Sequence, residues 1–135
     1  MTSTCLPVRG TRRLRRAACA LAVVLQLSLI VFGIVRTSTV VQVNHLFPFA
    51  DKVWHLIWYG GVAVLLWIAL SGRALAVLAI AAAFGVLDEG VQAFTPGRSA
   101  ELADLSIDIA AGCIVVGALS YLRSLASRRS AREVT

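Results

Sequence analysis

The chain is poor in acidic side chains, since only seven of its 135 residues are Asp or Glu, against 13 Lys or Arg. Charge of either sign is scarce, at 15%, whereas 59% of the residues are hydrophobic and the mean hydropathy is +0.82. A soluble domain of this length needs a more polar exterior, so the composition indicates a one-domain integral membrane protein. The basic residues flank apolar runs instead of lining a polar face, which argues against nucleic-acid binding.

Cysteine is also scarce. Cys5 lies in a basic leader, and Cys19 and Cys113 lie in apolar runs, with neither an even number nor the spacing of metal ligands. The sequence therefore predicts no disulfide framework, assigns no residue as a metal ligand, and contains no His-Glu-x-x-His zinc motif. We interpret the three cysteines as structural or incidental.

Four apolar runs are long enough to cross about 30 Å of hydrocarbon, which takes about 20 helical residues. They cover residues 17–35, 51–70, 74–94 and 104–122. We therefore expect an all-α fold, a four-helix bundle in the membrane. A basic leader at 1–16 precedes this membrane domain at 17–122, and a basic, frayed tail follows at 123–135.

The first run follows a cluster of arginines, as in a signal peptide. Its length and the lack of a clear cleavage site favour an uncleaved first membrane helix. Ser71-Gly72-Arg73 predicts a tight turn, so the second and third helices should be antiparallel neighbours. Asp88 and Glu89 interrupt the third run, which is either short or continues through Gln92 with its acids inside the membrane.

The basic residues predict how the bundle is oriented. On the four-span topology one side carries ten of them: Arg9, Arg12, Arg13, Arg15, Arg16, Arg73, Arg123, Arg128, Arg129 and Arg132. The other side carries Arg36, Lys52 and Arg98. Because basic residues favour the cytoplasmic side, we expect both termini to be cytoplasmic, an N-in/C-in topology. Six of the seven acidic residues then face outward, at or near the same helix ends: Asp51, Asp88, Glu89, Glu101, Asp104 and Asp108.

The first of three polar stretches begins the second run. Asp51, His55 and Tyr59 are spaced four residues apart, so on a helix they form one stripe, and Lys52 lies beside them. Each also has a simpler interpretation. Asp51 suits a helix N-cap, the aromatic residues suit an interfacial belt, and a single His is commonly structural.

The second stretch ends the third run. Asp88, Glu89 and Gln92 can share one sector of a helix, and Arg98 follows in a Pro-Gly turn. One acid placed at mid-membrane costs about 2.5–3.5 kcal/mol on insertion scales, so two acids offset several leucines. The alternative is an ordinary helix end with solvated acids.

The third stretch begins the fourth run. Asp104 and Asp108 lie one turn apart on one face, in a row that Gly112 continues. Asp104 suits an N-cap, but Asp108 lies about 6 Å further in, where capping does not explain it. The roughly opposite face carries a row of small residues suited to close helix packing: Ser106, Ala110, Cys113 and Gly117.

These stretches together resemble the VanZ-like family of small bacterial membrane proteins, over about residues 48–120. The motifs are Asp51-Lys52-x-x-His55-x-x-x-Tyr59, Asp88-Glu89-x-x-Gln92 with Pro96-Gly97-Arg98-Ser99, and Asp104-x-x-x-Asp108-x-x-x-Gly112. The resemblance implies a multi-pass protein of the bacterial plasma membrane, in a family named for resistance to the glycopeptide antibiotic teicoplanin. Many relatives have His where this chain has Val91, which removes a candidate metal ligand or proton carrier.

If the three stretches converge, they form an outward-facing polar pocket. Its candidate ligand-binding residues are Asp51, Lys52, His55, Tyr59, Asp88, Glu89, Gln92, Arg98, Asp104 and Asp108. The leading hypothesis is a non-catalytic envelope factor that binds a lipid headgroup, a cell-wall precursor or the glycopeptide. The alternative is a membrane-embedded enzyme for a lipid-linked or phosphorylated substrate, with His55 or Glu89 as acid or base and aspartates that could hold a divalent cation.

A transporter is a third hypothesis, although four helices make a thin pathway unless the protein oligomerises. The sequence leaves the oligomeric state, any cofactor and the identity of the ligand open.

Overall fold

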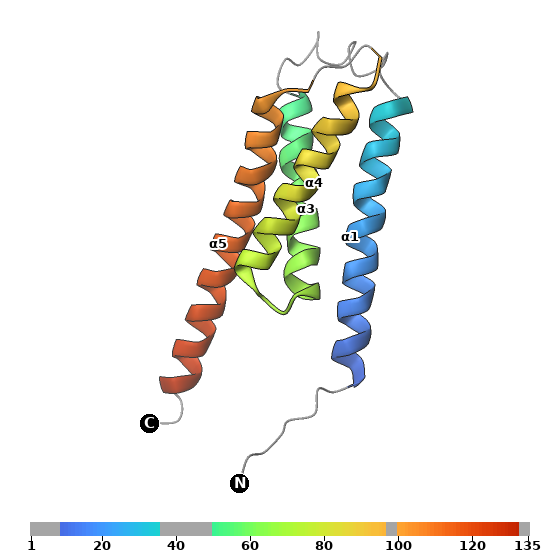
Figure 1. Cartoon of the computed structure of the whole chain (residues 1–135). Helices are drawn as coiled ribbons and strands as arrows, with labels where there is room; N and C mark the ends of the chain where they lie inside the picture. The colour runs from blue at the N-terminus through green and yellow to red at the C-terminus, as the bar shows by residue number, and fades with distance from the viewer. Residues whose placement is uncertain (1–8, 36–49, 97–99, 133–135) are drawn as a thin grey trace.

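The computed structural model describes residues 9–35, 50–96 and 100–132, which form four long helices and contain no strand. The helices are α1 (Arg9–Val35), α3 (Ala50–Ala69), α4 (Ala74–Ala93) and α5 (Leu102–Arg132). All four are long and apolar enough to cross a membrane. The predicted all-α, four-helix membrane bundle is confirmed. Helix α1 begins and α5 ends at the same end of the bundle, whereas the side of the membrane on which that end lies stays a prediction (Figure 1).

The first and last helices extend beyond the predicted spans. Helix α1 already begins at Arg9, inside the basic leader, and α5 continues to Arg132. The expected fraying of the tail is therefore wrong for these residues. The segment beyond residue 122 has neither Pro nor Gly, and Arg129 and Arg132 in the last turn complement the negative end of the helix dipole.

The interrupted third run forms one continuous helix. Helix α4 passes through Asp88, Glu89 and Gln92 and ends at Ala93. All three polar side chains are buried between the helices. The third helix is therefore not short, and Asp88 and Glu89 are not solvated acids at an ordinary helix end.

Residues 71–73 form the predicted tight turn between α3 and α4. Ser71 and Gly72 have φ angles of 55° and 74°, and the Gly72 N–H donates to the carbonyl oxygen of Trp67 at 2.9 Å. A Cβ on Gly72 would lie 3.0 Å from the Trp67 ring and 2.6 Å from a guanidinium nitrogen of Arg123. The turn therefore needs glycine both for its backbone conformation and for space. We call this the turn end of the bundle and the opposite end the acidic end.

Helix α3 contacts all three other helices, while α4 packs on α5 and α1 packs on α3 and α4. The larger core cluster consists of Ala22, Val62, Ala63, Leu66, Val77, Ala81 and Val116. The buried face of α5 carries Asp104, Asp108, Ala111, Gly112 and Val116. A Cβ on Gly112 would lie 3.6 Å from Leu78 and 3.7 Å from Ala81, so Gly112 permits the close approach of α4.

The small-residue row on the opposite face of α5 does not pack inside the bundle. All four of its members are exposed: Ser106, Ala110, Cys113 and Gly117. The expectation that this row mediates close packing is wrong for contacts within the chain. The row of Asp104, Asp108 and Gly112 forms part of the buried face of α5 instead.

Candidate functional site

Buried polar side chains gather at the acidic end of the bundle. At this end α3 begins, α4 ends and α5 begins (Figure 1). We define the polar cluster as the half-buried Lys52 and the buried His55, Tyr59, Asp88, Glu89, Gln92, Asp104 and Asp108. These are eight of the ten predicted site residues. The side chain of Asp51 and the whole of Arg98 lie outside the described residues, so their place in the site stays a prediction.

Lys52 joins the start of α3 to the start of α5. Its Nζ lies 3.0 Å from Glu101 Oε2 and contacts Asp104 Oδ1. The Asp104 side chain is only 7% exposed, whereas that of Glu101 is 52% exposed. The ammonium therefore forms ion pairs with a buried carboxylate of the cluster and with an exposed carboxylate at its rim.

His55 and Asp108 form a second link between the same helices, one turn deeper. His55 Nδ1 lies 2.9 Å from Asp108 Oδ1, and the side chains are 6% and 0% exposed. This contact orients the imidazole ring, and an ionised Asp108, which only accepts hydrogen bonds, requires a proton on Nδ1. The ring also stacks on Tyr59, with centroids 6.1 Å apart and an interplanar angle of 8°.

Tyr59 extends the cluster towards α1. Its hydroxyl accepts a hydrogen bond from Gln26 Nε2 at 3.2 Å and donates one to the carbonyl oxygen of Phe84 at 3.3 Å. Gln26 is 2% exposed and was not among the predicted site residues. A glutamine in the middle of an apolar run is the signal that could have found it, because such groups are disfavoured in lipid.

Helix α4 contributes three side chains. Gln92 Nε2 donates to Asp88 Oδ2 at 3.2 Å, one turn apart. Glu89 Oε2 accepts the backbone N–H of Glu101 at 2.7 Å, which ties the end of α4 to the residue before α5. The charge of Asp88 also acts on His55 and Tyr59, so the α4 carboxylates belong to the same electrostatic environment.

Gly85 brings α4 close to Asp108. A Cβ at this position would lie 3.3 Å from Asp108 Oδ2 and 3.0 Å from Leu105 Cδ1. An alanine here would require the Leu105 and Asp108 side chains to move by a few tenths of an ångström. The glycine thus sets how closely the Asp108 carboxylate is enclosed.

Several buried polar atoms have no hydrogen-bond partner within the described part of the chain. They are Gln26 Oε1, Trp58 Nε1, Glu89 Oε1 and Asp108 Oδ2. Three of the four are acceptor oxygens. Leaving such a group unpaired is unfavourable, by about 1–3 kcal/mol each, so the three oxygens indicate where a further donor would be stabilised.

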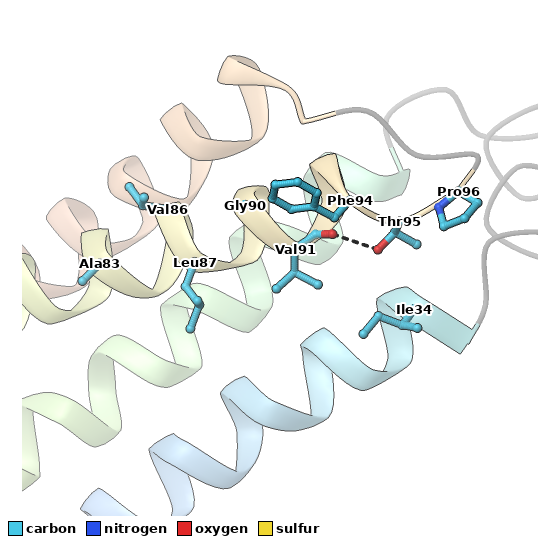
Figure 2. Close-up of a pocket in the computed structure, with 9 residues that line it drawn as sticks. All are labelled: Ile34, Ala83, Val86, Leu87, Gly90, Val91, Phe94, Thr95 and Pro96. Carbon is cyan, nitrogen blue, oxygen red and sulfur yellow. Dashed lines mark hydrogen bonds between the residues drawn. The ribbon is translucent and has the colours of Figure 1, made fainter.

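A groove on another face of α4 is apolar. It has a volume of about 820 Å³ and is lined by Ile34 of α1 and by Ala83, Val86, Leu87, Gly90, Val91, Phe94, Thr95 and Pro96. Figure 2 shows Leu87 and Val91 directed towards α1, with the Thr95 hydroxyl donating to the carbonyl oxygen of Val91 at 2.8 Å. None of the ten predicted residues lines this groove, so it is not the predicted polar pocket.

The described residues contain no group of three or more His, Cys, Asp or Glu side chains that could hold a metal ion. Cys19 and Cys113 are free and exposed, and Cys5 lies outside the described ranges. The side chains of the polar cluster form paired charges and hydrogen bonds between helices. Such an arrangement can bind a polar group or transfer a proton.

Comparison with known proteins identifies one family. The VanZ/LLP1 family model matches residues 6–123. The match covers most of the chain and extends the resemblance at residues 48–120 back through α1, the helix that contributes Gln26. No curated protein and no solved structure matches the chain.

Proposed function

The chain belongs to the VanZ/LLP1 family, and from this premise we propose that it acts in the bacterial cell envelope, where the polar cluster binds a polar group at the outer face of the plasma membrane. Binding there would alter surface properties or the access of glycopeptides of the teicoplanin type. The proposed ligands are a lipid headgroup, a cell-wall precursor or the glycopeptide itself. The topology predicted from the basic residues places the acidic end outside the cytoplasm, where such ligands occur.

The observation that carries this proposal is the burial of four carboxylates in helices that can span a membrane. Asp88, Glu89, Asp104 and Asp108 are between 1% and 7% exposed. A charged side chain within a membrane helix is unfavourable by about 2.5–3.5 kcal/mol at its centre. Buried ion pairs are also commonly less stabilising than apolar packing, so a functional reason for the cluster is the better explanation.

A membrane-embedded enzyme is the second candidate, and the contact between His55 and Asp108 favours it. A buried carboxylate on one imidazole nitrogen leaves the other nitrogen oriented for proton transfer. His55 is then the general acid or base, with Asp108 as its positioning residue. Glu89 is the other candidate catalytic group.

The test uses a bacterial strain that carries this gene, with the gene deleted and then restored. Restoration of the wild-type chain should change teicoplanin susceptibility and the binding of labelled teicoplanin to cells, whereas Gln92→Ala should not restore either. Ser106→Ala is the matched control, because Ser106 is an exposed polar residue of the neighbouring helix. Unchanged susceptibility and surface binding on deletion would contradict the proposed role.

The enzyme alternative is separated by a chemical readout. His55→Asn should then abolish a difference in lipid-linked or phosphorylated precursor pools between the deletion and the restored strain. Identical pools in all strains, at equal amounts of protein in the membrane, would exclude this alternative.

A further inference from the structure

We propose that the group recognised by the polar cluster is a primary ammonium, which binds between Glu89 and Asp108. This inference rests on the proposed function of the same site and specifies its ligand chemistry. It starts from the two carboxylate oxygens without a partner, Glu89 Oε1 and Asp108 Oδ2. The two residues are 7% and 1% exposed, so neither oxygen is compensated by bulk solvent.

The balance of donors and acceptors sets the ligand class. Ionised carboxylates only accept hydrogen bonds, and an ammonium carries three donors and no acceptor. Gln26 Oε1 adds a third unpaired acceptor at the α1 side of the cluster, against one unpaired donor, Trp58 Nε1. A phosphate or carboxylate would add acceptors and negative charge to a site that already has both in excess.

Lys52 already demonstrates this chemistry within the protein. Its ammonium bridges Asp104 of the cluster and Glu101 at the rim. Glu89 and Asp108 each have a buried carboxylate oxygen without a hydrogen-bond partner among the described residues. A ligand ammonium would do for these two acids what the lysine does for Asp104 and Glu101.

Asp108 and Glu89 are placed about one helical turn apart along α4. Gly85, whose absent Cβ would lie 3.3 Å from Asp108 Oδ2, precedes Glu89 by four residues. Four residues correspond to about 6 Å of helix rise. An ammonium bound to both oxygens needs them about 5–6 Å apart, since each charge-assisted hydrogen bond is about 2.7–2.9 Å long.

Two substitutions test the inference with little change in shape. Glu89→Gln keeps an oxygen to accept the Glu101 N–H, and Asp108→Asn keeps one to contact His55. Each replaces the unpartnered acceptor by an NH₂ donor, which repels an ammonium. Glu101→Gln is the matched control, because it also removes one negative charge but lies exposed at the rim.

The probe is ethanolamine, added to the full chain in uncharged maltoside micelles. It should raise the thermal unfolding midpoint saturably, whereas choline, which has no N–H donor, and inorganic phosphate should not. Glu89→Gln and Asp108→Asn should each increase the half-saturating concentration about tenfold or more, as expected for the loss of a charge-assisted hydrogen bond. Glu101→Gln should respond like the wild type.

A second arm identifies the source of the ammonium. If the site takes a lipid headgroup, the midpoint should be higher in phosphatidylethanolamine bilayers than in phosphatidylcholine bilayers, and Glu89→Gln should remove that difference. An equal response to choline, a response to phosphate instead, unchanged behaviour of both variants or no response in either arm would each overturn the inference. If no amine stabilises the protein but Gln92→Ala still fails to restore the teicoplanin phenotype, only the ammonium ligand is refuted. If deletion of the gene causes no phenotype, the proposed function is refuted.

Discussion

The two ends of the bundle are held together differently. At the turn end, a glycine-containing backbone turn and an apolar core join α3 and α4. At the acidic end, charged and hydrogen-bonding side chains join α3, α4 and α5. At the turn end, two arginine side chains donate to backbone oxygens near the end of α3. Arg15 Nε donates to the carbonyl oxygen of Ala69 at 2.9 Å, and Arg123 to that of Ser71 at 3.5 Å. These contacts satisfy helix ends without placing a carboxylate in the core.

The two ends differ in whether their side chains are explained by helix packing alone. Small and apolar side chains from all four helices form the core towards the turn end, so similar packing was available at the acidic end. The four-helix fold by itself therefore does not explain the buried carboxylates. The apolar core beneath Tyr59 also contains Val62, Ala63 and Leu66, which argues against a continuous polar pathway through the bundle.

Removal of Lys52 should have the largest effect. Lys52→Met leaves the buried Asp104 without its ammonium and should lower the free energy of unfolding by about 3 kcal/mol, the lower end for breaking a buried ion pair, since Lys52 is partly exposed. Reversible SDS unfolding in mixed micelles measures this. Lys52→Arg, which keeps the charge, is the control. A Met variant as stable as the wild type would mean that the acidic end is not held by charge.

At the turn end, backbone geometry should matter more than charge. Gly72→Ala forces a side chain onto a φ of 74° and against the Trp67 ring, and should destabilise the fold by about 1–2 kcal/mol. Gly90→Ala is the control, since a Cβ added to this helical glycine would point into open space, with no described atom within 4 Å. The same unfolding assay should find Gly90→Ala neutral or slightly stabilising. Equal losses for both glycines would contradict this explanation.

Between the two ends, Tyr59 connects the cluster to α1. Tyr59→Phe removes the acceptor for Gln26 and the donor for Phe84 O, and should destabilise by about 1 kcal/mol, a typical value for a hydrogen bond between membrane helices. Tyr121→Phe tests the same change at an exposed position of α5. An equal effect of the two variants in SDS unfolding would show that the Gln26 contact is not formed.

The smallest effect is expected at the rim of the cluster. Glu101→Gln removes the exposed partner of Lys52 and should change the unfolding free energy by about 0.5 kcal/mol or less, as for a surface ion pair. Compared with Lys52→Met, this variant shows whether the ion pair of Lys52 with Asp104 or that with Glu101 stabilises the fold more. A loss as large as that of the lysine variant would assign the link to Glu101.

Much of the fold could be predicted because lipid imposes simple constraints on length and hydropathy. The four runs follow from these constraints, and the turn at residues 71–73 follows from its Ser-Gly sequence between two of the runs. The helical tail could not be predicted from the apolar pattern, since α5 continues beyond the membrane run with favourable helix formers and a complementary charge at its end.

For the candidate site, helical spacing identified the residues of each stretch but not their partners. Spacing of four places Asp104 and Asp108 on one face, yet only the packing of α3 on α5 pairs them with Lys52 and His55. The same spacing gave two possible packing faces on α5, and the small-residue face was the wrong one. Gln26 was missed because one amide does not form a pattern, although its position in an apolar run is itself informative.

The account depends on polar groups from separate helices meeting inside the bundle, and the contact between His55 and Asp108 is its most direct test. Solid-state NMR in lipid bilayers, with ¹⁵N-histidine and ¹³Cγ-aspartate and with His45→Gln to leave one histidine, measures whether a carboxyl carbon lies near the His55 ring. We predict strong dipolar dephasing of Nδ1, consistent with the 2.9 Å contact to Asp108 Oδ1, and its loss in Asp108→Asn. An undephased His55 nitrogen, or dephasing that survives this substitution, would contradict the account.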